Sequence, residues 1–362
     1  MHNDSMDPNV KKVLEAAIMA PSGENAQPWK FVVHRQQDGV VIDVLVSDER
    51  AQSLYGWGNR ASYVAIGAAV ENMRVAAPSY GFSISISLFP KADNALLAAR
   101  VSLARGIAAH DPLAENINTR ATNRKPYDGK TLSDAEIRML QTVGEAHGCA
   151  LRIFTAREEI ATLARIGSLN ERIMLNNPTL HSFFFSHVNW TRAEDDEKKV
   201  GFFIDTLELP APARVGFRVM RSWPRARFLN RFLGFNKLVA KQNAALYGTA
   251  SAMGIVISKE ESPLEAVQAG MSVERIWLAA DSLGLSIQPL TGVLYWALRG
   301  RAGVHDGFSD AERGEIMRAY KDLDSIARLS GGVSYFMFRI GHAPAPTARA
   351  TRFAVDDVTT IV

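Results

Sequence analysis

The sequence predicts an α+β fold with sheets flanked by helices, and three observations support this prediction. Apolar residues alternate with serines over 82–88, the pattern of a strand with one buried face. Ser133-x-x-Glu136 has the spacing of a capping box, which opens a helix. Strands and helices follow one another without the strict alternation of a doubly wound sheet, so we expect separate layers.

Further elements follow along the chain. Apolar residues at helical spacing predict a helix from about Val10 to Ile18, begun by Asp7-Pro8. A turn at Asp38-Gly39 separates two apolar runs and predicts a hairpin. The other expected helices cover 60–77, 263–283 and 309–328, and the other expected strands lie within 29–34, 40–46, 100–105, 150–154, 246–258, 285–288 and 334–340.

Composition bounds the class of protein. The 362 residues suffice for two ordinary domains or one large one. With 47% apolar and 22% charged residues the chain can bury a core, and its net charge of +3 is too small to indicate nucleic acid by itself. The single cysteine, Cys149, excludes an internal disulfide. The first residues carry no signal pattern and no apolar run approaches membrane-spanning length, so we expect a cytoplasmic protein without an integral membrane segment.

Residues 20–29 read Ala-Pro-Ser-Gly-Glu-Asn-Ala-Gln-Pro-Trp, between the first predicted helix and the first strand. An ordinary polar loop is one interpretation. The ordered pattern Ala-Pro-Ser-x-x-Asn-x-Gln-Pro-Trp, followed by an apolar strand, resembles the signature of the nitroreductase family of FMN proteins. The resemblance implies that Ser22, Gly23 and Asn25 contact the flavin, whereas Gln27 and Trp29 hold the loop in shape.

The chain also contains a weak internal repeat. Residues 67–77 resemble 271–280, because each run ends near Ala-Ala and passes through Gly into a strand. In the nitroreductase family the corresponding helix is central, and ordinary members are dimers with flavins at the subunit interface. We therefore expect two nitroreductase-like halves fused in one chain as a pseudo-dimer, residues 1–115 and 116–362, with an insertion or lid around 176–242.

The ligand motifs are divided between these halves. Family subunits open with Arg-x-Ser/Thr-x-Lys/Arg, which residues 1–10 lack and which Arg120-Ala-Thr122-Asn-Arg124 matches in mid-chain. Conversely, 145–151 occupies the place of a second loop and lacks its pattern. Since a family site combines the loop of one unit with the arginines of the other, one complete site and one FMN per chain are expected. This arrangement resembles the fused, single-chain branch that includes the mycobacterial Acg-type proteins.

The resemblance assigns a role to each matching residue. Arg120 binds the FMN phosphate, Thr122 contacts the cofactor, and Arg124 lies near the N1/O2 edge, where a cation stabilises reduced flavin. Arg352, with Arg349 in reserve, matches basic residues that bind the phosphate after the final strand; a solvated basic tail is the alternative.

The resemblance also assigns Thr291 and Gly292 as backbone contacts to flavin N5, although Thr291 replaces an acidic residue found in many members. No catalytic side chain is assigned, because hydride moves between stacked rings.

The function implied is an FMN-dependent oxidoreductase that moves electrons from NAD(P)H to a small flat or activated acceptor. The alternatives are an FMN-binding storage or sequestration protein with little turnover and a flavin-free interaction module. A monomer would suffice, and a homodimer stays open. The chain has no dinucleotide-binding Gly-x-Gly-x-x-Gly turn, no P-loop and no His-Glu-x-x-His motif, and we expect no metal site. His181 and His187 are interpreted as packing or surface residues.

The stretch 214–241 is not explained by the family resemblance. It contains eight Arg and Lys residues, interleaved aromatic residues and no Asp or Glu. One interpretation is a covering segment with solvated basic side chains, or a lid over the flavin. The other is a surface for membrane lipid or an anionic substrate. We favour the first, because basic amphipathic patterns are common.

Overall fold

The computed structural model describes residues 6–51, 57–106, 108–328 and 331–362. The first of its two main sheets has the strand order β11-β1-β2-β4-β3, and β11 runs parallel to β1 while the other neighbours are antiparallel. Its strands are β1 (Trp29–Gln36), β2 (Gly39–Val46), β3 (Phe82–Leu88), β4 (Leu97–Arg105) and β11 (Thr359–Ile361). The predicted hairpin and the pairing of 82–88 with 100–105 are confirmed.

The second main sheet has the order β5-β8-β10-β9 and is antiparallel throughout. Its strands are β5 (Ala150–Phe154), β8 (Ala252–Ser258), β9 (Ser286–Pro289) and β10 (Val333–Gly341). Every residue of β8 and β10 is buried, because helices cover the sheet. A further short pair joins β6 (Val188–Asn189) to β7 (Phe202–Phe203).

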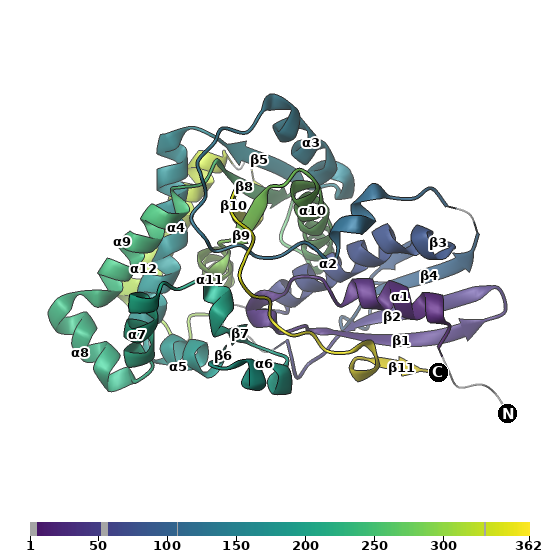
Figure 1. Ribbon diagram of the computed structural model, residues 1–362, viewed down its shortest axis with the longest axis horizontal. Coiled ribbons are helices and arrows are strands. Elements are labelled where there is room, and N and C mark those ends of the chain that lie inside the picture. The colour runs from purple at the N-terminus through teal and green to yellow at the C-terminus, as the bar shows by residue number, and fades with distance from the viewer. Residues whose placement is uncertain (1–5, 52–56, 107, 329–330) are drawn as a thin grey trace.

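Helices surround and separate the sheets (Figure 1). In the first half these are α1 (Pro8–Ala17) and α2 (Arg60–Ala76). The others are α3 (Asp134–Gly144), α4 (Arg157–Asn176), α5 (Pro178–Ser186), α6 (Arg192–Lys198), α7 (Ala211–Met220), α8 (Trp223–Leu233), α9 (Phe235–Tyr247), α10 (Pro263–Ser282), α11 (Gly292–Arg301) and α12 (Asp310–Ala327). Both sides of the capping box expected at Ser133 are made. Within the described ranges, no helix has both the length and the apolar character needed to cross a membrane.

Helices α2 and α10 pack against each other between the two sheets, and their contacts are reciprocal. A Cβ on Gly67 would lie 2.0 Å from the carbonyl oxygen of Val267. A Cβ on Gly270 would lie 2.0 Å from the carbonyl oxygen of Val64. Val64 and Gly67 correspond to Val267 and Gly270 in the sequence repeat, and such exchange of equivalent contacts is the property of a two-fold interface. The α+β fold of two fused halves is therefore confirmed.

Three parts of the chain differ from simple expectation. The region 176–242, which we call the insertion, contains most of α5 to α9, and its aromatic and arginine residues gave no clear period. Its assignment as an insertion or lid remains a prediction. Helix α11 begins directly after the 288–292 turn and was not predicted. Strand β11 returns the C-terminal end to the first sheet, and Figure 1 shows this segment passing between the halves. The division at residue 115 remains a prediction.

Candidate functional site

The loop after α1 has an unusual backbone. Glu24, Asn25 and Gln27 have φ values of 49°, 54° and 49°, in the left-handed region that side chains other than glycine rarely adopt. Such a conformation persists only where neighbouring structure holds it. Inside the loop, the Ser22 hydroxyl accepts a hydrogen bond of 3.0 Å from the Gln27 backbone nitrogen.

The two buried amide side chains of the loop bind distant segments. The Asn25 Nδ2 donates to the carbonyls of Lys199 at 3.0 Å and Thr351 at 2.9 Å. The Gln27 Nε2 donates to the same Lys199 carbonyl at 2.6 Å, and its Oε1 accepts from the Phe353 backbone nitrogen at 3.0 Å. The loop is thus fixed between the helical insertion and the C-terminal segment, and the side-chain nitrogen of Asn25 is engaged there.

Two of the predicted arginines meet this loop. Arg120 Nη2 donates to the Met19 carbonyl, and Arg352 Nη2 donates to the next carbonyl, Ala20, at 3.3 Å. Arg352 Nη1 also donates to Asn25 Oδ1. These carbonyls follow α1, where the helix dipole favours cations. The structure therefore brings the loop of the first half together with Arg120 and Arg352 from the rest of the chain.

Arg120 is buried beside a carboxylate and an indole ring. Its Nε lies 3.0 Å from Glu274 Oε1, and its guanidinium lies 4.8 Å from the centre of the Trp277 ring. Among the described residues, neither carboxylate oxygen of Glu274 has a hydrogen bond of good geometry. Burial raises the pKa of Glu274 to about 7, although Arg120 acts in the opposite direction. Sequence analysis assigned no role to Glu274 or Trp277.

Arg349 completes a cluster of three arginines. It donates to the carbonyls of Asn118 and Thr119, just before Arg120. Burial first, and then the charge of Arg120, lower the pKa of both Arg349 and Arg352, the latter to about 10. We call Arg120, Arg349 and Arg352 the arginine cluster.

The other predicted residues lie around β9 and the insertion. Thr122 forms a parallel bridge with Ile287 of β9, and Thr291 and Gly292 follow that strand at the start of α11. Arg124 Nη1 donates to the Thr206 carbonyl at 2.9 Å, and burial lowers the pKa of Arg124.

The insertion contacts both parts of the predicted site. The Gly201 backbone nitrogen donates to the Glu24 carbonyl at 2.8 Å, and Thr206 accepts the bond from Arg124. The segment 199–206 therefore lies against the loop and against the mid-chain motif. An insertion or lid was expected around 176–242, but these contacts could not be predicted, because each ends on a backbone carbonyl and joins residues far apart in the chain.

The arginine cluster fits the phosphate of a cofactor. Arg120 Nε and Arg352 Nε are buried and have no hydrogen-bond partner among the described residues. Buried Glu274 pairs with Arg120 at 3.0 Å and, together with buried Asp195, acts on the charge of Arg352, whereas Asp281 acts on Arg349. A phosphate dianion supplies acceptor oxygens and charge that would satisfy such an arrangement.

The equivalent place in the other half is closed by ion pairs. Glu71, which corresponds to Glu274 in the repeat, is fully buried and lies 2.7 Å from Arg74, 3.0 Å from His147 and 3.1 Å from Arg275. Burial opposes ionisation, but hydrogen bonds from His147 and Arg74 lower the pKa of Glu71 to about 2. His147 belongs to the stretch 145–151, where a second flavin loop was expected to be missing.

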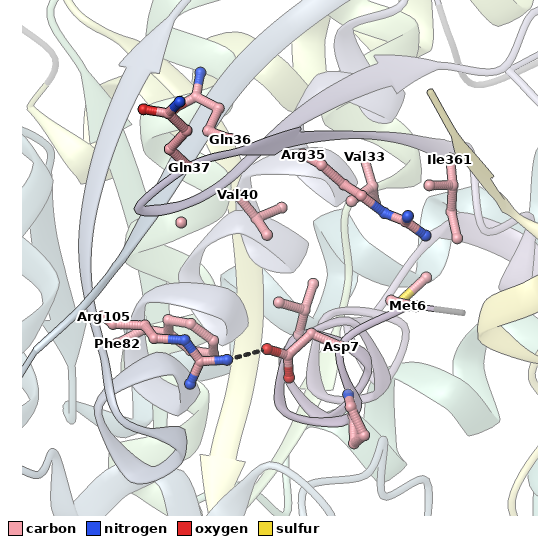
Figure 2. A pocket seen from close by; sticks show the side chains of 13 residues that line it. Met6, Asp7, Val33, Arg35, Gln36, Gln37, Val40, Phe82, Arg105 and Ile361 are labelled. Atoms are coloured by element: carbon pink, nitrogen blue, oxygen red, sulfur yellow. Dashed lines mark hydrogen bonds and ion pairs between the residues drawn. The ribbon is translucent and has the colours of Figure 1, made fainter. Parts of the chain in front are cut away.

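Other candidate features lie away from this site. A hollow of about 580 Å³ lies at the edge of the first sheet, and no predicted site residue lines it. Figure 2 shows the ion pair between Asp7 and Arg105 at this hollow. Within the described ranges no group of His, Cys, Asp and Glu could hold a metal ion. His181 is buried and its Nε2 lies 2.7 Å from the Met220 carbonyl, so it is a packing residue.

Comparisons with known proteins agree with the arrangement of the halves. The family model described as "Putative TM nitroreductase" matches residues 1–77. The Mycobacterium tuberculosis protein described as "Uncharacterized protein MT1398" is 27% identical over 352 residues, covering 95% of this chain and 47% of that protein. The "Putative NAD(P)H nitroreductase acg" of the same species is 24% identical over 187 residues, covering 51% of this chain and 54% of that protein. The chain spans about half the length of these curated relatives.

Among solved structures, the FMN-dependent nitroreductase NfnB from Mycobacterium smegmatis, in complex with NADPH, aligns at 13% identity and a TM-score of 0.39. The alignment covers 68% of this chain and 97% of that one. Residues 1–77 are thus similar to the nitroreductase family model, and the chain is similar in sequence to the two mycobacterial proteins, one of them the Acg protein.

Proposed function

We propose that the chain binds FMN and acts as an oxidoreductase of nitroreductase type, which moves electrons from NAD(P)H to a small flat or activated acceptor. The observation that supports this most is the meeting of Arg120 and Arg352 with the carbonyls of Met19 and Ala20, next to the predicted flavin loop. The name of one relative, "Putative NAD(P)H nitroreductase acg", points in the same direction.

We assign the phosphate to the arginine cluster, with Arg120 and Arg352 as principal ligands. Ser22, Gly23, Asn25 and Thr122 then hold the remainder of the cofactor, and Asn25 also acts by positioning Arg352. Bound FMN supplies the hydride acceptor.

The backbone of Thr291 and Gly292 is assigned to the ring, and the cation of Arg124 stabilises negative charge at the ring edge. The insertion excludes water through its bonds to Glu24 and Arg124.

We further propose one FMN per chain. The place equivalent to the arginine cluster already has its cations paired with Glu71, so a second phosphate would have to displace Arg74, His147 and Arg275. The flavin site is completed within one chain, so a monomer suffices. With one buried cysteine and no disulfide needed, we place this protein in the cytoplasm.

An FMN-storage protein is the second candidate. It is favoured by the insertion. The bonds of Gly201 to Glu24 and of Arg124 to Thr206 fix the segment 199–206 against the loop, where it would block the approach of nicotinamide to a bound flavin. Anaerobic mixing with NADPH or NADH separates the two functions: rapid bleaching of the flavin supports the oxidoreductase, and persistent yellow colour supports storage.

Cofactor binding itself is tested on purified protein by absorbance, by release of FMN on denaturation and by reconstitution after dialysis. Arg120→Ala, Arg352→Ala and Asn25→Ala should each weaken FMN retention, whereas Arg138→Ala, at an exposed position on α3, should not. Because Arg120→Ala leaves Glu274 unpaired, the double variant Arg120→Met/Glu274→Gln tests the same point without a buried unpaired charge. A colourless protein that cannot be reconstituted with FMN would refute both candidate functions.

A further inference from the structure

Helices α7, α8 and α9 form a corner of the molecule on the opposite side from the first sheet (Figure 1). Several large apolar side chains there face solvent. Phe228, Phe232 and Leu233 of α8 are 58%, 65% and 69% exposed. We call the exposed apolar and basic side chains of these three helices the basic apolar face. Its apolar members are Val215, Val219, Phe228, Phe232, Leu233 and Leu238.

Helix α8 has a distinct inner and outer side. Ala226 and Asn230, four residues apart, are buried, and Asn230 Nδ2 donates to the Leu175 carbonyl at 2.6 Å. Phe228 and Phe232, also four residues apart, point outward with their ring centres 4.8 Å apart. The inner contacts fix the helix on the protein, so the phenylalanine pair is held outward by the fold.

The same face carries cations without counter-charges. Seven basic side chains there are exposed, and none forms an ion pair with a carboxylate in the described part of the chain. No Asp or Glu occurs between Glu208 and Glu260. Arg214, by contrast, is paired with Asp205 at 2.6 Å. The seven are Arg218, Arg221, Arg225, Arg227, Arg231, Lys237 and Lys241.

We propose that the basic apolar face docks on the surface of an anionic lipid bilayer, with Phe228, Phe232 and Leu233 entering the boundary of the acyl chains and the cations contacting phosphate headgroups. Apolar side chains bind there by leaving water, and each nearby cation adds electrostatic attraction. Long basic side chains extend from such helices to the headgroups. This inference is independent of the proposed flavin chemistry.

Two other occupants fit less well. A second copy of this chain would bring two sets of unpaired cations together with no carboxylate between them, which is repulsive. Single-stranded nucleic acid would leave Val215, Leu233 and Leu238 unexplained, because bases stack on aromatic rings and planar groups rather than on aliphatic side chains. A charged bilayer matches both the aliphatic and the basic members of the face.

Flotation of the whole protein with vesicles tests the proposal. We expect binding to phosphatidylcholine vesicles containing about one third phosphatidylglycerol, weak binding to phosphatidylcholine alone, and a loss of binding as salt rises. Phe228→Ser/Phe232→Ser/Leu233→Ser should lower the partition coefficient by about tenfold or more. Arg225→Gln/Arg227→Gln/Arg231→Gln should lower it by about fivefold for each charge removed at low salt.

Matched controls exist elsewhere on the surface. Met139, Leu264 and Met317 are also exposed apolar residues, and their triple change to Ser should leave vesicle binding unaltered. The triple change Lys91→Gln/Arg152→Gln/Lys321→Gln removes the same charge at other exposed positions and should have a far smaller effect. Circular dichroism checks that all variants fold.

Four results would overturn the proposal. They are equal binding to neutral and anionic vesicles, equal losses in the test and control variants, binding of a single-stranded oligonucleotide with no binding to vesicles, and a dimer in light scattering that the α8 triple variant dissociates.

Discussion

Replacing Glu274 by glutamine tests whether burial raises the pKa of the Glu274 carboxylate. Glu274 is fully buried, its carboxylate oxygens lack hydrogen bonds from the described residues, and its nearest cation is Arg120 at 3.0 Å. Glutamine keeps the shape of the side chain and cannot titrate. The comparison therefore isolates the free energy of ionising this one group.

The expected magnitude follows from the two pKa values. An ordinary glutamate has a pKa of 4.5, and burial raises that of Glu274 to about 7. The folded state therefore holds this proton more tightly than the unfolded state. The stabilising contribution is fully present below pH 4.5 and is lost as pH rises through about 7. The loss amounts to about 3 kcal/mol of unfolding free energy.

The assay is guanidinium chloride unfolding of wild type and Glu274→Gln at several pH values, followed by tryptophan fluorescence and circular dichroism. Coincident curves from the two probes establish a single transition. The difference in unfolding free energy, wild type minus variant, should fall by about 3 kcal/mol from about pH 4 to about pH 8. Glu260→Gln, at an exposed position, should give a flat difference. A flat or rising difference for Glu274→Gln would refute the reasoning.

Three further predictions follow from the same region. The stability difference between wild type and Glu71→Gln should show the opposite dependence on pH. A pKa lowered from 4.5 to about 2 stabilises the wild type above pH 4.5 by about 3 kcal/mol, and this stabilisation is lost as pH falls towards 2. Acid unfolding curves of the two proteins measure it. FMN binding near pH 8 should take up close to one proton in wild type and none in Glu274→Gln, because the phosphate charge raises the pKa of Glu274 further. Calorimetry in two buffers of different ionisation enthalpy measures the number of protons taken up. Gly67→Ala should cost about 1–3 kcal/mol or more, since its Cβ would meet the Val267 backbone. Gly216→Ala on α7, whose Cβ would make only an ordinary contact of 3.9 Å with Phe235, should be neutral or stabilising by up to about 1 kcal/mol, and thermal unfolding compares the two variants.

Much of the fold was predictable because its signals are local. The alternation over 82–88 and the cap at Ser133 are properties of short stretches, and both elements form where expected. The repeated helix also predicted two fused halves. Helix α11 was missed because Trp296 and its neighbours are buried on most sides, which removes the helical period from the sequence. Strand β11 has three residues, too few for a pattern.

The assignment of the site residues remains a prediction, and the sequence indicated their types better than their contacts. The motifs identified Arg120 and Arg352, and both meet the flavin loop. Besides the side chains of Glu274 and Asn25, their partners are backbone carbonyls, which leave no trace in the sequence. Glu274 could have been noticed, because the repeat aligned it with Glu71 and a glutamate within an alanine-rich apolar helix is costly to bury without a function or a partner.

The asymmetry of the two halves originates near the crossing of α2 and α10. Glu71 and Glu274 occupy equivalent positions, so an exact duplication would give them equal surroundings. The residues three positions further on differ: Arg74 pairs with Glu71 at 2.7 Å, whereas Trp277 presents its ring to Arg120 at 4.8 Å. An arginine in place of Trp277 would compete with Arg120 for Glu274.

The residues directly after the two glutamates differ as well. Arg275 reaches Glu71 at 3.1 Å, while its counterpart Asn72 donates to the Ala16 carbonyl at 3.1 Å and brings no cation. Helix α10 thus supplies a cation, Arg275, beside Glu71, whereas α2 supplies none beside Glu274, whose charged form is favoured by Arg120 first and then by Asn72 and Arg352. Restoring a second phosphate site would require removing Arg275, Arg74 and His147 together, because any one of them left behind still pairs with Glu71. For that reason single substitutions at these positions should destabilise the protein without opening this place to a phosphate.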